Sequence, residues 1–408
     1  MFIRQNFRLY PNKAQSKQIS QWMGQARYVW NKMLEKNIEE YDTNKKFVFA
    51  YSMNKLLTEW KKEEDKIWLK ECPSQVLQQK CQDLDTALKN KFKYNNGFPK
   101  FKSKNTDKTG IRFPQGVTFS DSKIMLPKMK SGIKLVKHRE FLGEPGAVTI
   151  TCDAVGDFYA SVLVKVSDDF FPELVKDIKN SVGIDVGLKT FVTLSDGTTI
   201  DNPRFARTIH DKMKKLQRRH VRKQRSEKKN SNNREKARIK VAKLHRKIAR
   251  QRKNFINQNA ALIAKEYDLI TVEDLNVAGM MKNHKLARSI QDVGFTSFLI
   301  ALEWQCKKRG KHFHKISRWF PSSKTCSECG SIKQDLTLAD RVYHCHECGH
   351  EIDRDLNAAI NIDNLGREKY DLNNRNSRLP DMMDSQNKTG SCNGSTIRAG
   401  SNIALAVL

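Results

Sequence analysis

The chain has 408 residues, which is enough for two or three domains of ordinary size. Its 75 Lys and Arg residues outnumber its 45 Asp and Glu residues, so the formal net charge is +30 at pH 7. This excess argues against an enzyme that acts alone on small anionic metabolites and indicates a polyanionic partner, either a nucleic acid or an anionic membrane surface. No apolar run of about 18 residues is present, which excludes a transmembrane helix. The N-terminus lacks the apolar core of a secretory signal.

The distribution of the cysteines argues against a disulfide framework. Four of the nine cysteines form two CxxC pairs, whereas the other five are scattered along the chain. An odd number without regular spacing is atypical of small disulfide-stapled secreted proteins. We therefore expect a cytoplasmic protein whose thiols stay reduced, with one metal site at the paired cysteines.

The first 180 residues combine a strand, a helical segment and a β-rich segment. Apolar and basic residues nearly alternate over 2–10, which predicts a strand, and apolar residues at helical spacing predict helices over 15–93. Residues 94–180 contain short β-rich runs punctuated by Gly and Pro, a pattern typical of a small barrel or sandwich. We expect one β-barrel domain built from residues 1–14 and 94–180, with residues 15–93 inserted as a helical lobe.

From residue 181 the sequence predicts a sheet followed by a long helical hairpin. Residues 181–200 fit two strands, a turn at Asp196-Gly197 and a third strand, since Asp-Gly between β-rich runs favours a hairpin turn. A basic helical region follows over 204–266, and a polar stretch at 226–234 should form a loop within it. Near-heptad spacing in the second helix predicts one narrow packed face. That face comprises Ala237, Val241, Leu244, Ile248, Phe255 and Leu262.

The last third of the chain alternates short strands and helices. The apolar run 268–275 predicts a buried strand, residues 288–310 an amphipathic helix, and residues 312–320 a further strand. Another helix is expected over 353–365. The tail from 369 to 408 is rich in Asn, Ser, Gly and Asp and lacks hydrophobic periodicity, so we expect it to be disordered.

Positive charge is concentrated in the helical hairpin. Residues 204–254 contain 22 Lys and Arg but only 3 Asp and Glu, a local net charge of +19. A charge run is usually a solvated face, but like charges at this density repel one another unless phosphates neutralise them. The hairpin is therefore expected to contact nucleic acid, although its charge does not distinguish DNA from RNA. The candidate contact residues are Arg218, Arg219, Arg222, Lys243, Arg246, Lys247 and Arg250.

The two CxxC pairs have the spacing of a four-cysteine zinc site. Cys326 and Cys329 are separated by 15 residues from Cys345 and Cys348. Two such turns can present four thiolates to a tetrahedral Zn²⁺, and four protein ligands leave no open position, so the zinc should be structural. A glycine follows the second cysteine of each pair, where the turn needs a permissive backbone. Three nearby histidines could be alternative ligands or exposed side chains. They are His344, His346 and His350.

Three carboxylates occupy positions suited to metal chemistry. Asp185 lies inside the apolar strand GIDVG, Glu273 ends the strand LITVE, and Asp355 lies near the start of the helix DRDLNAAINIDNL. A buried charge is costly unless it is paired or metal-bound, and Gly183 and Gly187 would allow another backbone to approach Asp185. Hard oxygen ligands suit Mg²⁺, and two Mg²⁺ ions can support phosphodiester hydrolysis. The three acids are thus candidate catalytic ligands of two Mg²⁺ ions.

The helix distinguishes its two acids. Asp353 stands where an N-cap is expected, and capping is its simplest role. Asp355 shares a small apolar face with Ala359 and Ile362, so this face should pack on the sheet and direct Asp355 towards the strands. Strand alternation should turn Asp274 away from Glu273.

Taken together, the motifs resemble those of the transposon-encoded TnpB proteins, RNA-guided DNA endonucleases related to type V CRISPR effectors. The matching segments are GIDVGLKTF, TVEDLNVAGM, FPSSKTCSECG, YHCHECG, DRDLNAAINI, RLYPNKAQ and GFPKFKSK. The resemblance spans roughly residues 1–368 and includes the order of the motifs. By motif, Asp185, Glu273 and Asp355 match the family's catalytic acids, and the four cysteines match its zinc ligands.

The resemblance implies a multidomain α+β and α/β architecture. A wedge-type β-barrel would carry a helical recognition lobe, followed by a RuvC-like nuclease domain of RNase H-like fold at 181–320 and 352–368 that is split by a zinc element at 321–351. The implied partners are a guide RNA from the transposon end and double-stranded target DNA, in a prokaryotic cytosol or nucleoid and with no membrane association. A monomer is favoured. Tyr51 and Gln78 fall near positions that could bind a short motif flanking the target, although either could instead pack or cap.

Two other functions remain compatible with the residues. The first is a DNA transposase with an RNase H-like carboxylate triad, but no clear helix-turn-helix for binding transposon ends is visible. The second is a non-catalytic nucleic-acid-binding regulator, against which the complete set of acids argues.

Overall fold

The computed structural model describes residues 1–104, 110–224, 231–337 and 339–378, which form two compact units. The first unit is Met1–Asp168, and the second comprises the described residues from Asp169 onward. In the described part of the chain, no helix has both the length and the apolar character of a membrane span.

The first unit contains a seven-stranded antiparallel sheet in the order β2-β6-β7-β1-β5-β4-β3. The predicted N-terminal strand β1 pairs with both β7 and β5 and thereby joins the later strands, as expected. In the described residues the order is linear, with β2 and β3 at the edges, so the expected barrel takes the form of a curled sheet. The strands are β1 (Phe2–Tyr10), β2 (Ile111–Phe113), β3 (Thr118–Phe119), β4 (Lys123–Met125), β5 (Ile133–Val136), β6 (Glu144–Cys152) and β7 (Phe158–Lys165).

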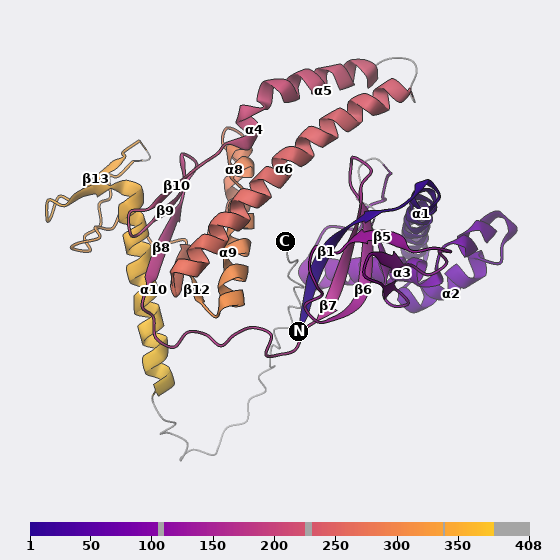
Figure 1. Ribbon diagram of the computed structural model, residues 1–408, viewed down its shortest axis with the longest axis horizontal. Helices are drawn as coiled ribbons and strands as arrows, with labels where there is room; N and C mark the ends of the chain where they lie inside the picture. The colour runs from indigo at the N-terminus through magenta and orange to yellow at the C-terminus, as the bar shows by residue number, and fades with distance from the viewer. Residues whose placement is uncertain (105–109, 225–230, 338, 379–408) are drawn as a thin grey trace, which may run out of the picture. The chain divides into compact units, whose positions relative to one another are not determined.

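The helical segment is inserted between β1 and β2, as predicted (Figure 1). Its longest helix begins after a capping box in which Asn12 and Gln15 satisfy each other's backbone N–H groups. The helix buries a stripe that includes Ile19 and Trp22. The elements are α1 (Lys13–Asn44), α2 (Ala50–Trp60), the 3₁₀ helix η1 (Glu64–Glu71) and α3 (Ser74–Tyr94).

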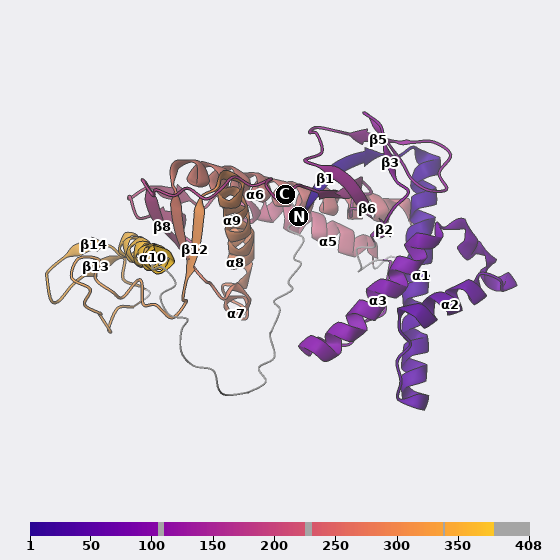
Figure 2. The ribbon, with the colours of Figure 1, turned by 90° about the horizontal axis from the view of Figure 1, so that it is seen from below.

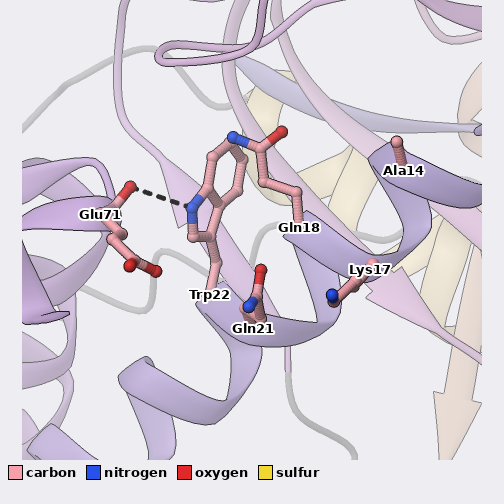
Figure 3. A pocket seen from close by; sticks show the side chains of 6 residues that line it. All are labelled: Ala14, Lys17, Gln18, Gln21, Trp22 and Glu71. Carbon is pink, nitrogen blue, oxygen red and sulfur yellow. Dashed lines mark hydrogen bonds between the residues drawn. The ribbon is translucent and has the colours of Figure 1, made fainter.

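A pocket of about 330 Å³ lies beside α1 (Figure 3). The Trp22 indole N–H donates to the Glu71 carbonyl at 3.2 Å and ties α1 to the end of η1 at this point. The lining residues are Ala14, Lys17, Gln18, Gln21, Trp22 and Glu71, none of which is a predicted site residue.

The second unit contains a five-stranded sheet in the order β10-β9-β8-β11-β12. The first three strands are antiparallel and include the predicted Asp196-Gly197 turn, whereas β11 runs parallel to both β8 and β12. The strands are β8 (Ser181–Val186), β9 (Thr190–Leu194), β10 (Thr199–Asp201), β11 (Leu269–Glu273) and β12 (His312–Ile316). A separate small hairpin consists of β13 (Val342–His344) and β14 (Glu351–Asp353).

Helices cover both faces of this sheet (Figure 2). On one face, Ile256 and Phe298 from two helices share a core with Val182 and Ile184 of β8. The other face is covered by α10, which lies along β8 (Figure 1). The helices are α4 (Phe205–Thr208), α5 (His210–Gln224), α6 (Asn232–Glu266), α7 (Val277–Met280), α8 (Ala287–Val293), α9 (Phe295–Arg309) and α10 (Arg354–Arg378).

The basic segment forms the predicted helical hairpin of α5 and α6. A small core of Met213, Leu244 and Ile248 holds the two helices together. The prediction of the packed face of α6 is wrong near the C-terminus of the helix, because Leu262 is 59% exposed and Ile263 is buried instead. A straight helix has 3.6 residues per turn, so its buried face drifts from a seven-residue repeat. Residues 225–230, in the expected loop, lie outside the described residues.

Three further boundaries differ from the sequence prediction. The expected helix at 288–310 is divided into α8 and α9 by Gly294, whose φ of +75° caps the first helix. The expected strand at 312–320 ends at Ile316. The last helix α10 continues to Arg378 and so includes the first ten residues, 369–378, of the predicted disordered tail. The rest of that tail lies outside the described residues.

Close contact between α10 and the sheet depends on Gly183. A Cβ at this position would lie 2.0 Å from the Ala359 carbonyl oxygen and 2.4 Å from the Asp363 backbone nitrogen. Gly366 meets the sheet in the same way, because its Cβ would lie 1.9 Å from Oγ1 of Thr271. The predicted role of Gly183 in allowing another backbone to approach is confirmed, and that backbone is α10.

Gly183→Ala should therefore destabilise the second unit strongly. Backbone atoms of α10 cannot swing aside, so the helix must move, and overpacking of this kind costs about 3 kcal/mol. Urea unfolding of the two variants would measure the effect. The matched control is Gly24→Ala in α1, where the nearest atom is 3.9 Å away and helix propensity favours alanine by about 0.5–1 kcal/mol. Equal stabilities of Gly183→Ala and the parent protein would contradict the prediction.

Candidate active site and metal centre

Two parallel strands place Asp185 and Glu273 on the same face of the sheet. Gly183 of β8 is paired with Thr271 of β11, and both residues contact α10. Side chains of a strand alternate between faces, so the residues two positions further on, Asp185 and Glu273, also belong to the face covered by α10. Both carboxylates are half-buried at the carboxyl ends of their strands.

The third acid, Asp355, comes from the first turn of α10. Asp353 accepts hydrogen bonds from the backbone N–H groups of Asp355 and Leu356 at 2.9 and 3.1 Å, so it is the N-cap, as predicted. Ala359 and Ile362 on the face of Asp355 are fully buried. The helix thus brings Asp355 to the sheet face that holds the other two acids.

The electrostatics of Asp185 show that the three acids are close enough to interact. Burial, together with the charges of Glu273 and Asp355, raises the pKa of Asp185 to about 7, although Arg354 partly opposes this shift. Burial also raises the pKa of Glu273, which accepts a hydrogen bond from the buried hydroxyl of Ser322. The site thus holds carboxylates close together, and ionising them there costs free energy. A bound cation would lower this cost.

Arg354 brings a positive charge to the site. The Arg354 guanidinium donates to Asp355 at 3.0 Å, and this ion pair is largely buried. In the described part of the chain, the three carboxylates do not form a group as tight as the cysteine cluster described below.

Asp185→Asn should stabilise zinc-loaded protein that has no added magnesium. The folded-state pKa of Asp185 is about 7 and the unfolded value is near 3.9, so the folded state loses stability as the pH rises towards and through 7. The neutral amide avoids this loss. We expect the free energy of unfolding of Asp185→Asn to exceed that of the parent protein by roughly 1–3 kcal/mol at pH 8, and by less at pH 5.5. Urea unfolding at both pH values provides the measurement. Asp274→Asn, at the half-exposed neighbour of Glu273, serves as the control, and a less stable Asp185→Asn protein at pH 8 would refute the prediction.

The four predicted cysteines lie together. Their Sγ atoms are all within 4.8 Å of one another, with 3.7 Å between Cys326 and Cys348 and 3.6 Å between Cys329 and Cys345. Four thiolates at about 2.3 Å from a central tetrahedral Zn²⁺ would be about 3.8 Å apart. The spacing of these sulfurs therefore fits a zinc ion at their centre.

Each pair of cysteines sits on a tight turn closed by a glycine. Gly330 and Gly349 have φ values of +75° and +72°, as expected of permissive residues, and their N–H groups donate to the carbonyls of Cys326 and Cys345. Ser331 adds a hydroxyl 3.2 Å from Cys329 Sγ and 3.1 Å from Cys345 Sγ. The nearby histidines are not members of the cysteine group.

The candidate nucleic-acid contacts lie mostly on exposed positions. On α5 and α6 the structure exposes Arg218, Arg219, Arg222, Lys243, Lys247 and Arg250, and half-buries Arg246. In the first unit, Tyr51 of α2 is 86% exposed and Gln78 of α3 is also exposed. These positions are accessible to a ligand, and contact with nucleic acid stays a prediction for all of them.

Two polar partners of the acids, Arg354 and Ser322, were not predicted from the sequence. Arg354 lies between two aspartates in the sequence DRD, so its proximity to Asp355 could have been noticed. Ser322 had no such signal, because its contact with Glu273 depends on the course of the loop after β12.

Comparison with known proteins connects these motifs to one family. A family model described as "Probable transposase" (OrfB_IS605) matches residues 161–284, and one described as "Cas12f1-like, TNB domain" matches residues 295–362. A "Putative RNA-guided DNA endonuclease" of Streptomyces pristinaespiralis is 34% identical over 359 residues, which is 87% of each chain. The chain belongs to the TnpB family.

Other matches agree with this TnpB membership. "Putative RNA-guided DNA endonuclease InsQ" of Escherichia coli (strain K12) is 30% identical over 375 residues, which is 87% of this chain and 90% of the relative. A structure titled "Cryo-EM structure of the Cas12f1-sgRNA-target DNA complex" has a TM-score of 0.54 at 17% identity and covers 86% of this chain and 83% of its own, so the likeness concerns the fold.

One family model differs from the local structure of this TnpB chain. A model described as "Helix-turn-helix domain" matches residues 1–46. The structure has the strand β1 and the uninterrupted 32-residue helix α1 in this range. The absence of a clear helix-turn-helix signal in the sequence agrees with the single helix.

Proposed function

We propose that this TnpB chain is an RNA-guided DNA endonuclease of a transposable element that cleaves target DNA next to a short flanking motif. The observation that carries the proposal is the convergence of Asp185, Glu273 and Asp355, from two strands and one helix, on one face of the sheet. The names of the two relatives support the same activity.

The nuclease domain would be RuvC-like, with an RNase H-like fold. In support of this, the sheet has three antiparallel strands followed by two parallel strands, with helices on both faces. The three acids would hold two Mg²⁺ ions, which when bound supply an activated water and stabilise the leaving oxygen in phosphodiester hydrolysis. Ser322 would orient Glu273, and Arg354 would orient Asp355.

The remaining parts would bind nucleic acid and position it. The cysteines would hold a structural Zn²⁺ within a ribbon-like element at 321–351. The curled sheet would act as the wedge domain and residues 15–93 as the recognition lobe, with Tyr51 and Gln78 near the flanking motif. The basic hairpin would contact the phosphates of the guide RNA and the target DNA. Pairing of guide and target would provide sequence specificity. The protein would act as a monomer in a prokaryotic cytosol.

The test is to purify the protein from a host that carries the native locus and to sequence the RNA that co-purifies. A single abundant RNA with a variable end is expected, and a guide designed on it should direct cleavage of a matched duplex in the presence of Mg²⁺. RNA of random sequence, or none, would contradict the proposal. Strand-transfer products formed without RNA would instead identify a transposase, and metal-independent binding without cleavage would identify a regulator.

A further inference from the structure

Trp319 is unusually exposed for a tryptophan. Its side chain is 86% accessible, a value matched only by Tyr51 among the large hydrophobic side chains of the described residues. Among the residues that the structure describes, Trp319 takes part in no aromatic ring pair and no cation–π pair. An indole offers a large flat apolar face, so leaving it in water is costly unless a ligand covers it.

The loop that holds Trp319 is fixed beside the candidate active site. On one side of Trp319, Arg318 forms an ion pair with Asp274, the residue after Glu273. On the other side, Ser322 donates a hydrogen bond to Glu273 itself. Backbone bonds within the loop hold its turn, including Phe320 N–H to the Ser317 carbonyl at 3.1 Å. The loop thus presents Trp319 from a segment that is tied to the end of β11 at two points.

We infer that Trp319 is a positioning residue that stacks on an unpaired nucleobase of the DNA strand that enters the carboxylate site. The inference rests on the proposed function. The chemistry that favours a base is the combination of an uncovered indole, a neighbouring site suited to phosphodiesters, and a chain with a net charge of +30. In a duplex each base already stacks on its neighbours, so the indole selects strands whose bases are free. Stacking would hold the adjacent phosphate in register with Asp185, Glu273 and Asp355.

The test is single-turnover cleavage by guide-loaded protein at saturating matched target. Trp319→Ala should lower the cleavage rate about five- to a hundredfold, the range expected for one base–aromatic stack, and Trp319→Phe should restore most of it. Leu262→Ala, which removes another exposed apolar side chain of the same unit, should cut at the parent rate. Cleavage by Trp319→Ala at the parent rate would overturn the inference.

A substrate series distinguishes stacking from a merely structural role. Abasic nucleotides placed one at a time along the cleaved strand should slow the parent protein at one position, and Trp319→Ala should be insensitive there. If Trp319→Ala is slow but shows the same abasic profile as the parent, and Trp319→Phe does not restore the rate, Trp319 is structural and the inference is wrong.

A measurement that does not need cleavage separates this inference from the proposed function. Indole fluorescence of Trp319, taken as the difference between the parent protein and Trp319→Phe, should be quenched by a short single-stranded oligothymidine and not by a hairpin duplex. Quenching in a protein that fails to cut would refute the proposed function alone. Absence of quenching in a protein that does cut would refute the stacking role alone.

Discussion

Replacing Asp185 by alanine should remove guided DNA cleavage and leave RNA binding intact. Asp185 lies on the sheet face where Glu273 and Asp355 converge, and its charge interacts with both. On the proposed function the three acids hold the metal ions together, so the cleavage rate should fall at least about a thousandfold, equivalent to about 4 kcal/mol. Cleavage of a matched duplex by guide-loaded protein is the measurement, with co-purified RNA quantified in parallel. Glu273→Ala should behave in the same way.

The matched control is Glu303→Ala. Glu303 is an exposed acid of α9 that pairs with Lys315, so its removal changes the charge of the chain equally without altering the set of three. It should retain cleavage. Full activity of Asp185→Ala would show that the catalytic centre lies elsewhere, and loss of RNA binding would show that the substitution disturbs the fold.

Removal of one cysteine ligand should unfold the zinc element. The apolar core of this element is small and consists mainly of Cys326, Tyr343 and Cys345, with Leu336 and Ile352 packed beside it. So small a core cannot stabilise a chain segment alone, whereas structural zinc contributes about 10–16 kcal/mol in small zinc domains. Cys345→Ser should therefore lose most of its zinc and expose residues 321–351 to protease. Metal analysis and limited proteolysis measure the two effects.

Cys152→Ser provides the control for this experiment. Cys152 is a half-buried thiol at the end of β6 in the first unit, outside the cysteine group. Its replacement should leave about one zinc per chain and the same protease pattern as the parent protein. A Cys345→Ser protein with full zinc content would show that the four thiolates are not its ligands.

Local patterns in the sequence were sufficient to predict the elements that form the site. Alternation predicted β1, the apolar run predicted β11, and the Asp-Gly turn predicted the hairpin of β9 and β10. Position within α10 separated the capping role of Asp353 from the inward position of Asp355. The cysteine spacing predicted the sulfur cluster. Each of these predictions depends on interactions within a few residues of the chain or on a fixed periodicity of the sequence.

Features that depend on long-range packing could not be predicted. The contact of Ser322 with Glu273 and the exposure of Trp319 follow from the path of one loop, which no periodicity specifies. The burial of Ile263 in place of Leu262 depends on how far the helix has rotated along its length. The division of the predicted helix at Gly294 reflects a backbone conformation that many sequences with a single glycine do not adopt.

The packing of α10 on β8 has a consequence for the order of events during synthesis. Asp185 leaves the ribosome 170 residues before Asp355, and the helix that supplies Asp355 is the last described element of the chain. At about 5–20 residues per second, some 10–30 s separate the two. In the later part of that interval, once residue 266 has been made, the nascent protein has its basic hairpin but lacks Asp355. On the proposed function, a chain that ends before Asp355 should therefore still bind phosphates through its basic hairpin but should not cut DNA.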